Sequence, residues 1–512
     1  MSGSVTNNSK EKLIFWMSFI LILIMAIFLR FFEIELRPPH NDESVNFLFY
    51  EQTNRMGYYP YSHENYHGPL YFYIITALIN IFGDSLIVLR ASAIAAGISC
   101  ILFLAMFQNK LGKKFVILAS LFIATSPSLL FFSRYAIHET LLTFGTLMLG
   151  LSLFYWMEEK KSFFIYLSAF ALAILITTKE TFPIALISTA LPIFFLYPPK
   201  SIWQNLSGSK SHIIYASLVL ILLTLFTFSA GFRWYQGISE MFLAFPQWFA
   251  RSKTDVGHFK PFFYYLSDVI AVTEPHVALA IIFFPVICLI FTIQNLIQHK
   301  SLKEQILPDM RLTLFLAFWT IVSFLFYSQI KYKTVWLIIN ITLPAQLFLA
   351  SLLSKFNLKK TFQIIIFILL LAVILKIQIT NSLKYNYSTF PLPFTEIAVT
   401  DSIPYGPGNP YSYVHTSKGT VELVAEVEKY WQAKPDAKIL VGVNGYFPLP
   451  YYFRKKVSQC AYAKTNDIDK SALEYDIMIL DFYTQKWDNP SWDKKYYRLS
   501  DYQESYTYFK KQ

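Results

Sequence analysis

Long apolar segments that recur through most of the chain are the feature that most restricts its fold. They occur repeatedly between residues 13 and 380, and each approaches or exceeds the roughly 17 to 25 residues with which a helix crosses a bilayer. Hydrophobic residues make up 54% of the chain and charged residues only 15%, which excludes disordered, collagen-like and coiled-coil proteins. The sequence therefore predicts an α-helical polytopic membrane protein.

About eleven of these segments are candidate membrane spans. They cover residues 13–32, 85–107, 115–132, 138–157, 162–178, 181–197, 212–232, 276–297, 312–328, 334–353 and 361–380. The first is too long for a signal peptide and has no small-residue cleavage site after it, so we interpret it as an uncleaved span. Residues 70–82 rise only about 20 Å as a helix, which is less than the thickness of the hydrocarbon core. We therefore expect them to lie in the membrane–water interface or to form a re-entrant segment.

Basic residues indicate the orientation of the chain. Short Lys-rich connections alternate with longer connections that hold fewer basic residues, and the Lys-rich set belongs in the cytoplasm. This places residues 1–12 inside, a transmembrane domain at 13–380 and a long loop, 34–84, outside, in a multi-pass protein of the plasma (inner) membrane. The same pattern accounts for the net charge of +11 without a nucleic-acid partner.

Residues 381–512 change in composition and gain Pro, Gly, Asp and Tyr. A helical pattern at residues 421–431 and strand-like patterns at 438–443 and 477–480 predict an extracytoplasmic α/β domain of about 130 residues, large enough for its own core. The three cysteines of the chain are too few for a disulfide framework. The cysteine pattern therefore does not indicate whether the protein faces an oxidising or a reducing compartment.

Charged residues collect at the predicted outer ends of the spans. Lys179 and Glu180 stand between two apolar segments, and Arg134 and Glu139 flank two others. Ionisable groups near membrane depth are costly unless they are paired or face water, and they mark functional sites; the alternative for each residue is a charge that snorkels to the interface. Cations here suit a phosphate or pyrophosphate on a lipid. They are Arg134, Lys179, Lys331 and Lys333.

Two adjacent carboxylates, Asp42 and Glu43, follow a Pro-Pro-His turn in loop 34–84. Such groups can serve as a general base toward an acceptor hydroxyl or can hold a divalent metal. The alternative is an acidic pair at the start of a solvated helix, where negative charge is favoured. The dipeptide alone does not decide between these interpretations.

The segment from His63 to His67 fits the zinc motif H-E-x-x-H. That motif needs a continuous helix, which places its two histidines on one face. Gly68 and Pro69 follow at once, so we expect a loop that leads into residues 70–82. A zinc protease is therefore the less favoured hypothesis.

These motifs resemble those of the membrane glycosyltransferases of the C superfamily, in particular the protein O-mannosyltransferase and lipid A aminoarabinose transferase relatives. Asp42 and Glu43 match the acidic pair of the long outer loop in that superfamily. His67-Gly-Pro69 resembles its turn before a juxtamembrane helix, and Ser133-Arg134 with Glu139 resembles its next outer motif.

A closer resemblance is to the prokaryotic flippase activity-associated protein family. Six segments suggest it: His40–Glu43, Tyr66–Leu70, Thr178–Glu180, Tyr327-Ser328 with Tyr332–Trp336, Asn409–Tyr413 and Pro448–Arg454. One departure is Val335, where the family pattern has proline before the tryptophan. It puts the role of the turn from Lys333 to Trp336 in doubt.

The resemblance implies an inverting glycosyltransferase that moves a sugar from a polyprenyl-phosphate donor to a glycan, lipid or protein acceptor on the outer side of the membrane. It implies Asp42 as the general base, with Glu43 and His67 orienting the base or the donor. It also implies that Arg134, Lys179 and Lys333 bind the donor phosphate, with Glu139 as a partner of Arg134. Tyr332 would contact the donor or the acceptor. Relatives differ in their use of a divalent metal, so a metal cofactor is left open.

A flippase, or a flippase partner for lipid-linked saccharides, is the alternative function, because it would use the same basic boundary without a base at Asp42. Secondary transport is less favoured, because the ionisable residues gather at one end of the spans and not at the midplane. Aromatic residues at 232–235 and 245–248 suit stacking on sugars, although aromatic belts occur at every membrane interface.

Overall fold

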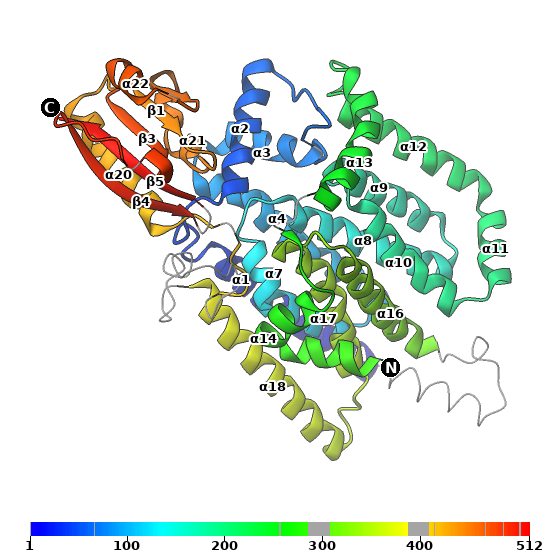
Figure 1. Ribbon diagram of the computed structural model, residues 1–512. Helices are drawn as coiled ribbons and strands as arrows, with labels where there is room; N and C mark the ends of the chain where they lie inside the picture. Colours follow the sequence, from blue (N-terminus) through cyan, green and yellow to red (C-terminus); the bar gives the residue numbers. More distant parts are fainter. Residues whose placement is uncertain are drawn as a thin grey trace.

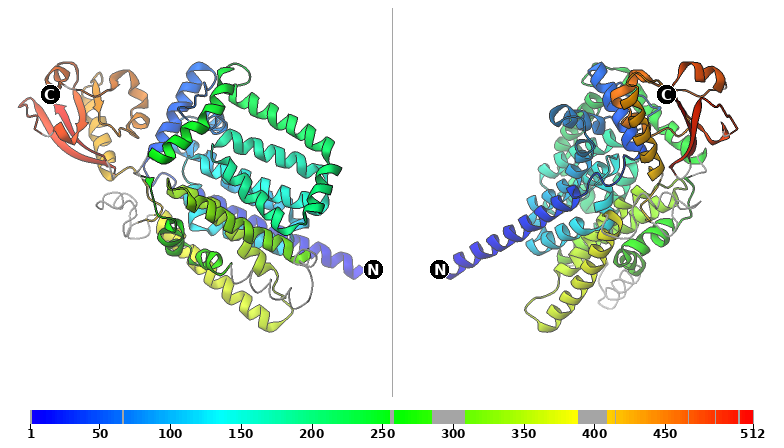
Figure 2. Two further views of the ribbon diagram at one scale, coloured as in Figure 1. Left: turned by 45° about the vertical axis from the view of Figure 1, so that its right-hand side comes forward. Right: turned by 90° about the vertical axis from the view of Figure 1, so that its left-hand side faces the viewer.

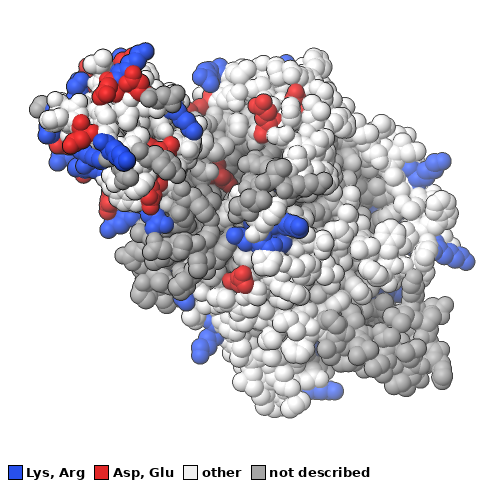
Figure 3. Space-filling model, in the orientation of Figure 1, with Lys and Arg blue, Asp and Glu red and all other residues white. Residues whose placement is uncertain are grey.

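The computed structural model describes residues 2–65, 67–254, 258–284, 308–387, 409–413, 415–465, 467–484, 486–500 and 503–511. A large helical body carries a small sheet domain at one end (Figure 1). The N-terminus and the sheet domain lie at opposite ends of the molecule in both views of Figure 2. On the face drawn in Figure 3, charged side chains crowd the sheet domain and are sparse over the described part of the helical body, as expected for a body surrounded by lipid.

Seven helices in the described part are long and apolar enough to cross a bilayer, or eight if a bent pair counts as one span. They are α1 (Ser2–Phe31), α4 (Leu86–Met106), α8 (His138–Glu159), α12 (Lys210–Phe228), α16 (Pro308–Gln329), η3 with α17 (Val335–Ile338 and Ile339–Ser354) and α18 (Thr361–Asn386). Helices α1, α12 and α18 expose most of their apolar side chains, whereas α8 and α17 are enclosed by the others. This arrangement confirms the predicted polytopic helical fold.

Three of the eleven predicted spans are divided or form helices of fewer than 18 residues, and a fourth is described only in part. Residues 115–132 divide into α6 (Lys113–Thr125) and α7 (Pro127–Phe132), because Ser126 caps the second helix and Pro127 begins it. Helix α9 (Ser162–Thr178) has 17 residues. Helix α10 (Phe182–Leu196) meets α11 (Pro199–Gly208) at 116°. Of the eighth predicted span, residues 285–297 lie outside the described residues.

Loop 34–84 folds into two short helices, α2 (Asn41–Met56) and α3 (Leu70–Phe82). Helix α2 begins at a capping box built on His40 and Glu43, and ends at Gly57, whose φ of 75° suits a residue without a Cβ. Helix α3 has 13 residues, as the sequence predicts. Helix α13 (Gln236–Thr254) belongs to the loop after α12, and Figure 1 shows α2, α3 and α13 at the same end of the body.

The C-terminal domain is built on a five-stranded sheet of order β2-β1-β3-β5-β4. Strands β2, β1 and β3 are parallel, and β5 and β4 continue the sheet antiparallel. The strands are β1 (Ile439–Gly442), β2 (Cys460–Tyr462), β3 (Ile477–Asp481), β4 (Trp492–Ser500) and β5 (Gln503–Lys510). Helix α20 (Lys418–Ala433) packs its apolar face on this sheet. The predicted α/β domain is confirmed, with its helix and two strands near the predicted positions.

The C-terminal domain rests on α2 and on the start of α4. Arg454 forms an ion pair with Asp84 at 2.9 Å, and the Tyr451 ring packs edge-on against Phe47. Tyr451 belongs to the short helix α21 (Leu449–Tyr452). The domain therefore lies beside α2, whose first turn contains Asp42.

Candidate active site

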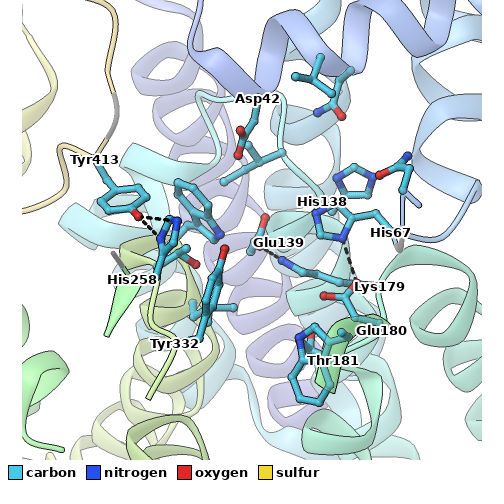
Figure 4. A pocket seen from close by; sticks show the side chains of 18 of the residues that line it. Asp42, His67, His138, Glu139, Lys179, Glu180, Thr181, His258, Tyr332 and Tyr413 are labelled. Atoms are coloured by element: carbon cyan, nitrogen blue, oxygen red, sulfur yellow. Dashed lines mark hydrogen bonds and ion pairs between the residues drawn. The ribbon is translucent and has the colours of Figure 1, made fainter. Parts of the chain in front are cut away.

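One cavity of about 470 Å³ lies between α2, the start of α8, the connection from α9 to α10, and the segment that follows α16. Asp42, His67, Glu139, Lys179 and Tyr332 line it. Figure 4 shows their side chains around a common space, with Asp42 on one side and Lys179 with Glu180 on another. The structure thus brings five of the eight predicted site residues into one cavity, from segments far apart in the sequence.

Asp42 lies in the first turn of α2, where the chain leaves a Pro-Pro-His turn. Its carboxylate is half-buried and borders the cavity. The backbone N–H of Asp42 donates to Nδ1 of His40 at 3.0 Å. The local sequence therefore fixes the backbone under this carboxylate while the carboxylate itself stays accessible.

Glu43 does not line the cavity, although the sequence pairs it with Asp42. It is fully buried and accepts hydrogen bonds from Nε and Nη2 of Arg90, at 2.8 and 2.7 Å. The backbone N–H groups of His40 and Ala136 also donate to it, at 2.9 and 2.8 Å. Burial alone would raise the pKa of Glu43, but the Arg90 charge and these hydrogen bonds lower it below its ordinary value. Glu43 fixes α2 to α4, and the expected contact with a substrate is replaced by this ion pair.

Lys179 and Glu139 form a buried ion pair within the cavity. Beside it, Nδ1 of His67 lies 2.9 Å from Oε2 of Glu180. The His67-Gly-Pro turn makes this possible, because Gly68 donates to the Thr178 carbonyl at 3.1 Å. A Cβ on Gly68 would lie 2.2 Å from the Thr177 carbonyl oxygen, so only glycine permits such a close approach. The turn therefore holds His67 against the end of α9.

Arg134 and Lys333 are buried outside the cavity lining. The Arg134 guanidinium donates to the carbonyls of Leu29 and Glu33, at 2.6 and 2.9 Å, so the expected pair between Arg134 and Glu139 is not formed. Lys333 donates to the carbonyls of Lys260 and Ile330, and burial lowers its pKa to about 8. Of the predicted phosphate-binding cations, Lys179 alone lines this cavity within the described residues.

An aromatic wall closes the side of the cavity opposite His67. His258 stacks near Tyr332, with ring centroids 4.5 Å apart, and the Tyr413 hydroxyl contacts Nδ1 of His258. Trp336 packs against Tyr413 at 5.5 Å. Sequence reasoning selected only Tyr332 here, because nothing in the local pattern shows that segments near residues 258 and 413 meet. Trp248, from the expected aromatic group at 245–248, also lines the cavity.

Three buried polar side chains that line the cavity have no hydrogen-bond partner. They are His138 through Nε2, Thr181 through Oγ1 and Tyr327 through its hydroxyl. All three are at most 5% exposed, and they come from three elements around the pair of Lys179 and Glu139. Buried polar groups are nearly always hydrogen-bonded, so this end of the cavity is suited to a polar ligand. His138 and Thr181 could have been suspected from the sequence, because His138 precedes Glu139 and Thr181 follows the charged pair Lys179-Glu180.

A second cavity, of about 330 Å³, adjoins the first at Glu180, which lines both. The rest of its lining is mainly apolar and comes mostly from α12 and α13. Ile221 and Phe242 line it and are also 52% and 64% exposed. The cavity therefore reaches the apolar outer surface of the helical body.

The described residues of the H-E-x-x-H segment form no helix, as predicted, and its histidines contact different partners. His63 contacts Glu240 of α13, whereas His67 contacts Glu180. Across the described residues, no group of three or more His, Cys, Asp or Glu side chains is arranged to hold a metal ion.

Comparisons with known proteins agree with this architecture. The family model for dolichyl-phosphate-mannose-protein mannosyltransferase matches residues 66–229. Crystal structures of ArnT from Cupriavidus metallidurans match 96% of this chain and 97% of their own: the undecaprenyl phosphate-bound form with a TM-score of 0.58 and 13% identity, the apo form with 0.60 and 11%. The chain therefore has a fold similar to that of the membrane glycosyltransferases of the C superfamily, and the family model matches about a third of it. The narrower flippase-associated family stays a prediction.

A further match to this superfamily fold is the oligosaccharyltransferase of Archaeoglobus fulgidus, solved with Zn and sulfate. Its TM-score is 0.54 at 13% identity, over 91% of this chain and 68% of that one. No curated protein matches the chain. The segment that the family model matches includes His67, Glu139 and Lys179 but not Asp42 or Tyr332.

Proposed function

We propose that the chain is an inverting glycosyltransferase that moves a sugar from a polyprenyl-phosphate donor to an acceptor on the outer face of the membrane. The observation that carries this proposal is one cavity that holds a half-buried carboxylate, Asp42, and a buried cation, Lys179, on separate sides. The superfamily fold supports the reaction class.

In this reaction Asp42 takes the proton of an acceptor hydroxyl as its oxygen forms a bond to the anomeric carbon. The bond between that carbon and the phosphate oxygen breaks on the opposite side, which inverts the configuration. Negative charge grows on the leaving phosphate, and Lys179 stabilises it. A preorganised donor of this kind contributes several kcal/mol to transition-state stabilisation, roughly 3–4 kcal/mol in measured cases.

The unpartnered groups of His138, Thr181 and Tyr327 support the placement of the polar part of the donor at the Lys179 end. A phosphate or a sugar hydroxyl supplies the hydrogen bonds that these groups lack. The aromatic wall of Tyr332, Trp336 and His258 offers ring faces to the sugar.

The apolar cavity supports a lipid-linked donor. It meets the polar cavity at Glu180 and reaches the outer surface at Ile221 and Phe242. An apolar chain in this cavity would lead to the polar cavity without crossing charged surface. The separation of the N-terminus from the C-terminal domain, at opposite ends of the molecule, supports a cytoplasmic N-terminus and an extracytoplasmic C-terminal domain.

The test is sugar transfer from a labelled polyprenyl-phosphate sugar by membranes that contain the wild-type protein or Asp42→Asn. Transfer should collapse in the variant, while protein level and export of lipid-linked sugar persist. Lys495→Ala is a matched control, because it removes an exposed ion pair with Glu426 far from the cavity. Undiminished transfer by Asp42→Asn rejects the catalytic assignment, and loss of lipid-linked sugar export in its place favours a flippase.

A further inference from the structure

His40 connects Asp42 to the C-terminal region of the chain. It is 2% exposed and occupies the position just before α2. Its Nδ1 accepts the backbone N–H of Asp42 at 3.0 Å, and its Nε2 lies 2.8 Å from the backbone carbonyl oxygen of Tyr413. The two ring nitrogens therefore join residues from opposite ends of the chain, with His40 and Tyr413 separated by 373 positions.

The two partners determine which nitrogen carries the proton. A carbonyl oxygen can only accept, so Nε2 must donate to Tyr413. An N–H group can only donate, so Nδ1 must be free to accept from Asp42. Both bonds form together only in the neutral imidazole with its proton on Nε2.

The Tyr413 carbonyl belongs to a segment that is held from several sides. Thr416 donates through its hydroxyl to the Pro39 carbonyl, directly before His40. The Tyr413 N–H donates to Nδ1 of His415 at 2.8 Å, and Nε2 of His415 contacts the Tyr135 hydroxyl. The segment thus provides a fixed acceptor for His40 and also places the Tyr413 ring in the cavity.

We propose that His40 is a positioning residue that sets the place of Asp42 from the C-terminal side of the chain. In this arrangement residues 409–413 and 415–417 are part of the active site and do more than connect two domains. The inference rests on the proposed function, because it takes Asp42 as the base. A misplacement of about 1 Å at a reacting group can lower a rate about a hundredfold.

The decisive variant is His40→Asn, measured in purified full-length protein by transfer kinetics and thermal unfolding. Asparagine is among the best residues at a helix N-cap, so it keeps a cap on α2 but is too short to join Asp42 to the Tyr413 carbonyl. We expect kcat to fall about 10- to 100-fold, with KM for the donor and the unfolding temperature close to wild type. A residue that only caps the helix would be replaced by asparagine without loss of kcat.

A second variant tests the same link without touching the ring. Thr416→Val removes the hydroxyl that holds the segment to Pro39, and should lower kcat in the same direction but less strongly. If Asp42→Asn is inactive but His40→Asn and Thr416→Val both keep the wild-type kcat, the inference is overturned. If Asp42→Asn itself retains full transfer, the proposed function fails first, so the two failures are distinguishable. Lys495→Ala again serves as the unaffected control.

Discussion

Lys179 of the α9–α10 connection forms an ion pair with Glu139 of α8, and both side chains are less than a tenth exposed. The pair joins the start of α8 to the end of α9, within the cavity that Asp42 also lines. It keeps the cation in place when no anionic ligand is bound, and a leaving phosphate meets a charge that is already positioned.

The first prediction separates the structural from the chemical role of this pair. Lys179→Met should lower the free energy of unfolding by about 3–5 kcal/mol, because Glu139 is left buried and unpaired. Lys179→Met with Glu139→Leu should regain most of that stability and still fail to transfer sugar. Thermal unfolding and transfer rates on the same preparations measure this, and an active double variant would contradict a role for Lys179 at the phosphate.

A second prediction concerns Arg90 and Glu43. Arg90→Lys should destabilise the N-terminal end of α4 and lower transfer, because lysine cannot make the paired hydrogen bonds with both Glu43 oxygens. Protease sensitivity of the chain between α2 and α4 should rise in this variant. Arg454→Lys is the matched control, since its ion pair with Asp84 lies nearer the surface; equal effects of both substitutions would argue against a special role for Arg90.

The third prediction concerns pH. The folded pKa of Glu43 is lowered, so its contribution to stability is complete above the unfolded pKa of about 4.3 and disappears as pH falls through the lower folded value. Wild type should therefore lose unfolding temperature more steeply than Glu43→Gln as the pH falls below about 4.3. Parallel slopes for the two proteins in detergent would contradict the assignment.

Gly68 gives a fourth prediction. Gly68→Ala should push the His67 turn away from α9, because the new methyl group would lie 2.2 Å from a backbone oxygen that cannot move aside. Transfer should fall, and the His67 contact with Glu180 should be lost. Gly208→Ala is a suitable control, since a Cβ added there would meet nothing within 4 Å, and it should leave transfer unchanged.

The apolar cavity leads to a fifth prediction. Ala244 is 4% exposed and lines this cavity, so Ala244→Trp should fill it. KM should rise for a long-chain polyprenyl-phosphate sugar and much less for a donor with a short, water-soluble chain. Donor titrations with both chain lengths measure the difference, and an equal rise for the two would place the lipid elsewhere.

Much of the fold could be predicted from local patterns. Apolar length locates the spans, the short length of residues 70–82 marks α3, a helical pattern marks α20, and strand-like patterns mark two strands of the sheet. Breaks inside spans were harder, because Ser126 and Pro127 end one helix and begin another without reducing the apolar character of the segment.

The site was predicted less completely, because residue type does not reveal which partner a charge will meet. Arg134 and Lys333 are positively charged like Lys179, but backbone carbonyls from distant segments take up their hydrogen bonds. Arg90 stands alone in an apolar segment, and that isolation was a usable sign of a buried counterion. No local pattern indicates that Tyr413 reaches a cavity formed by the first loop.

The hydrogen bond between the His40 ring and the Tyr413 carbonyl has a consequence for chimaeras of this chain with proteins of similar fold. A chimaera that exchanges the sheet domain after residue 417 would keep the recipient's own Tyr413 carbonyl, which binds the His40 ring. A chimaera joined at the end of α18 would replace that carbonyl with one from the donor protein. Two hybrids with identical sheet domains should thus differ in turnover according to the junction alone.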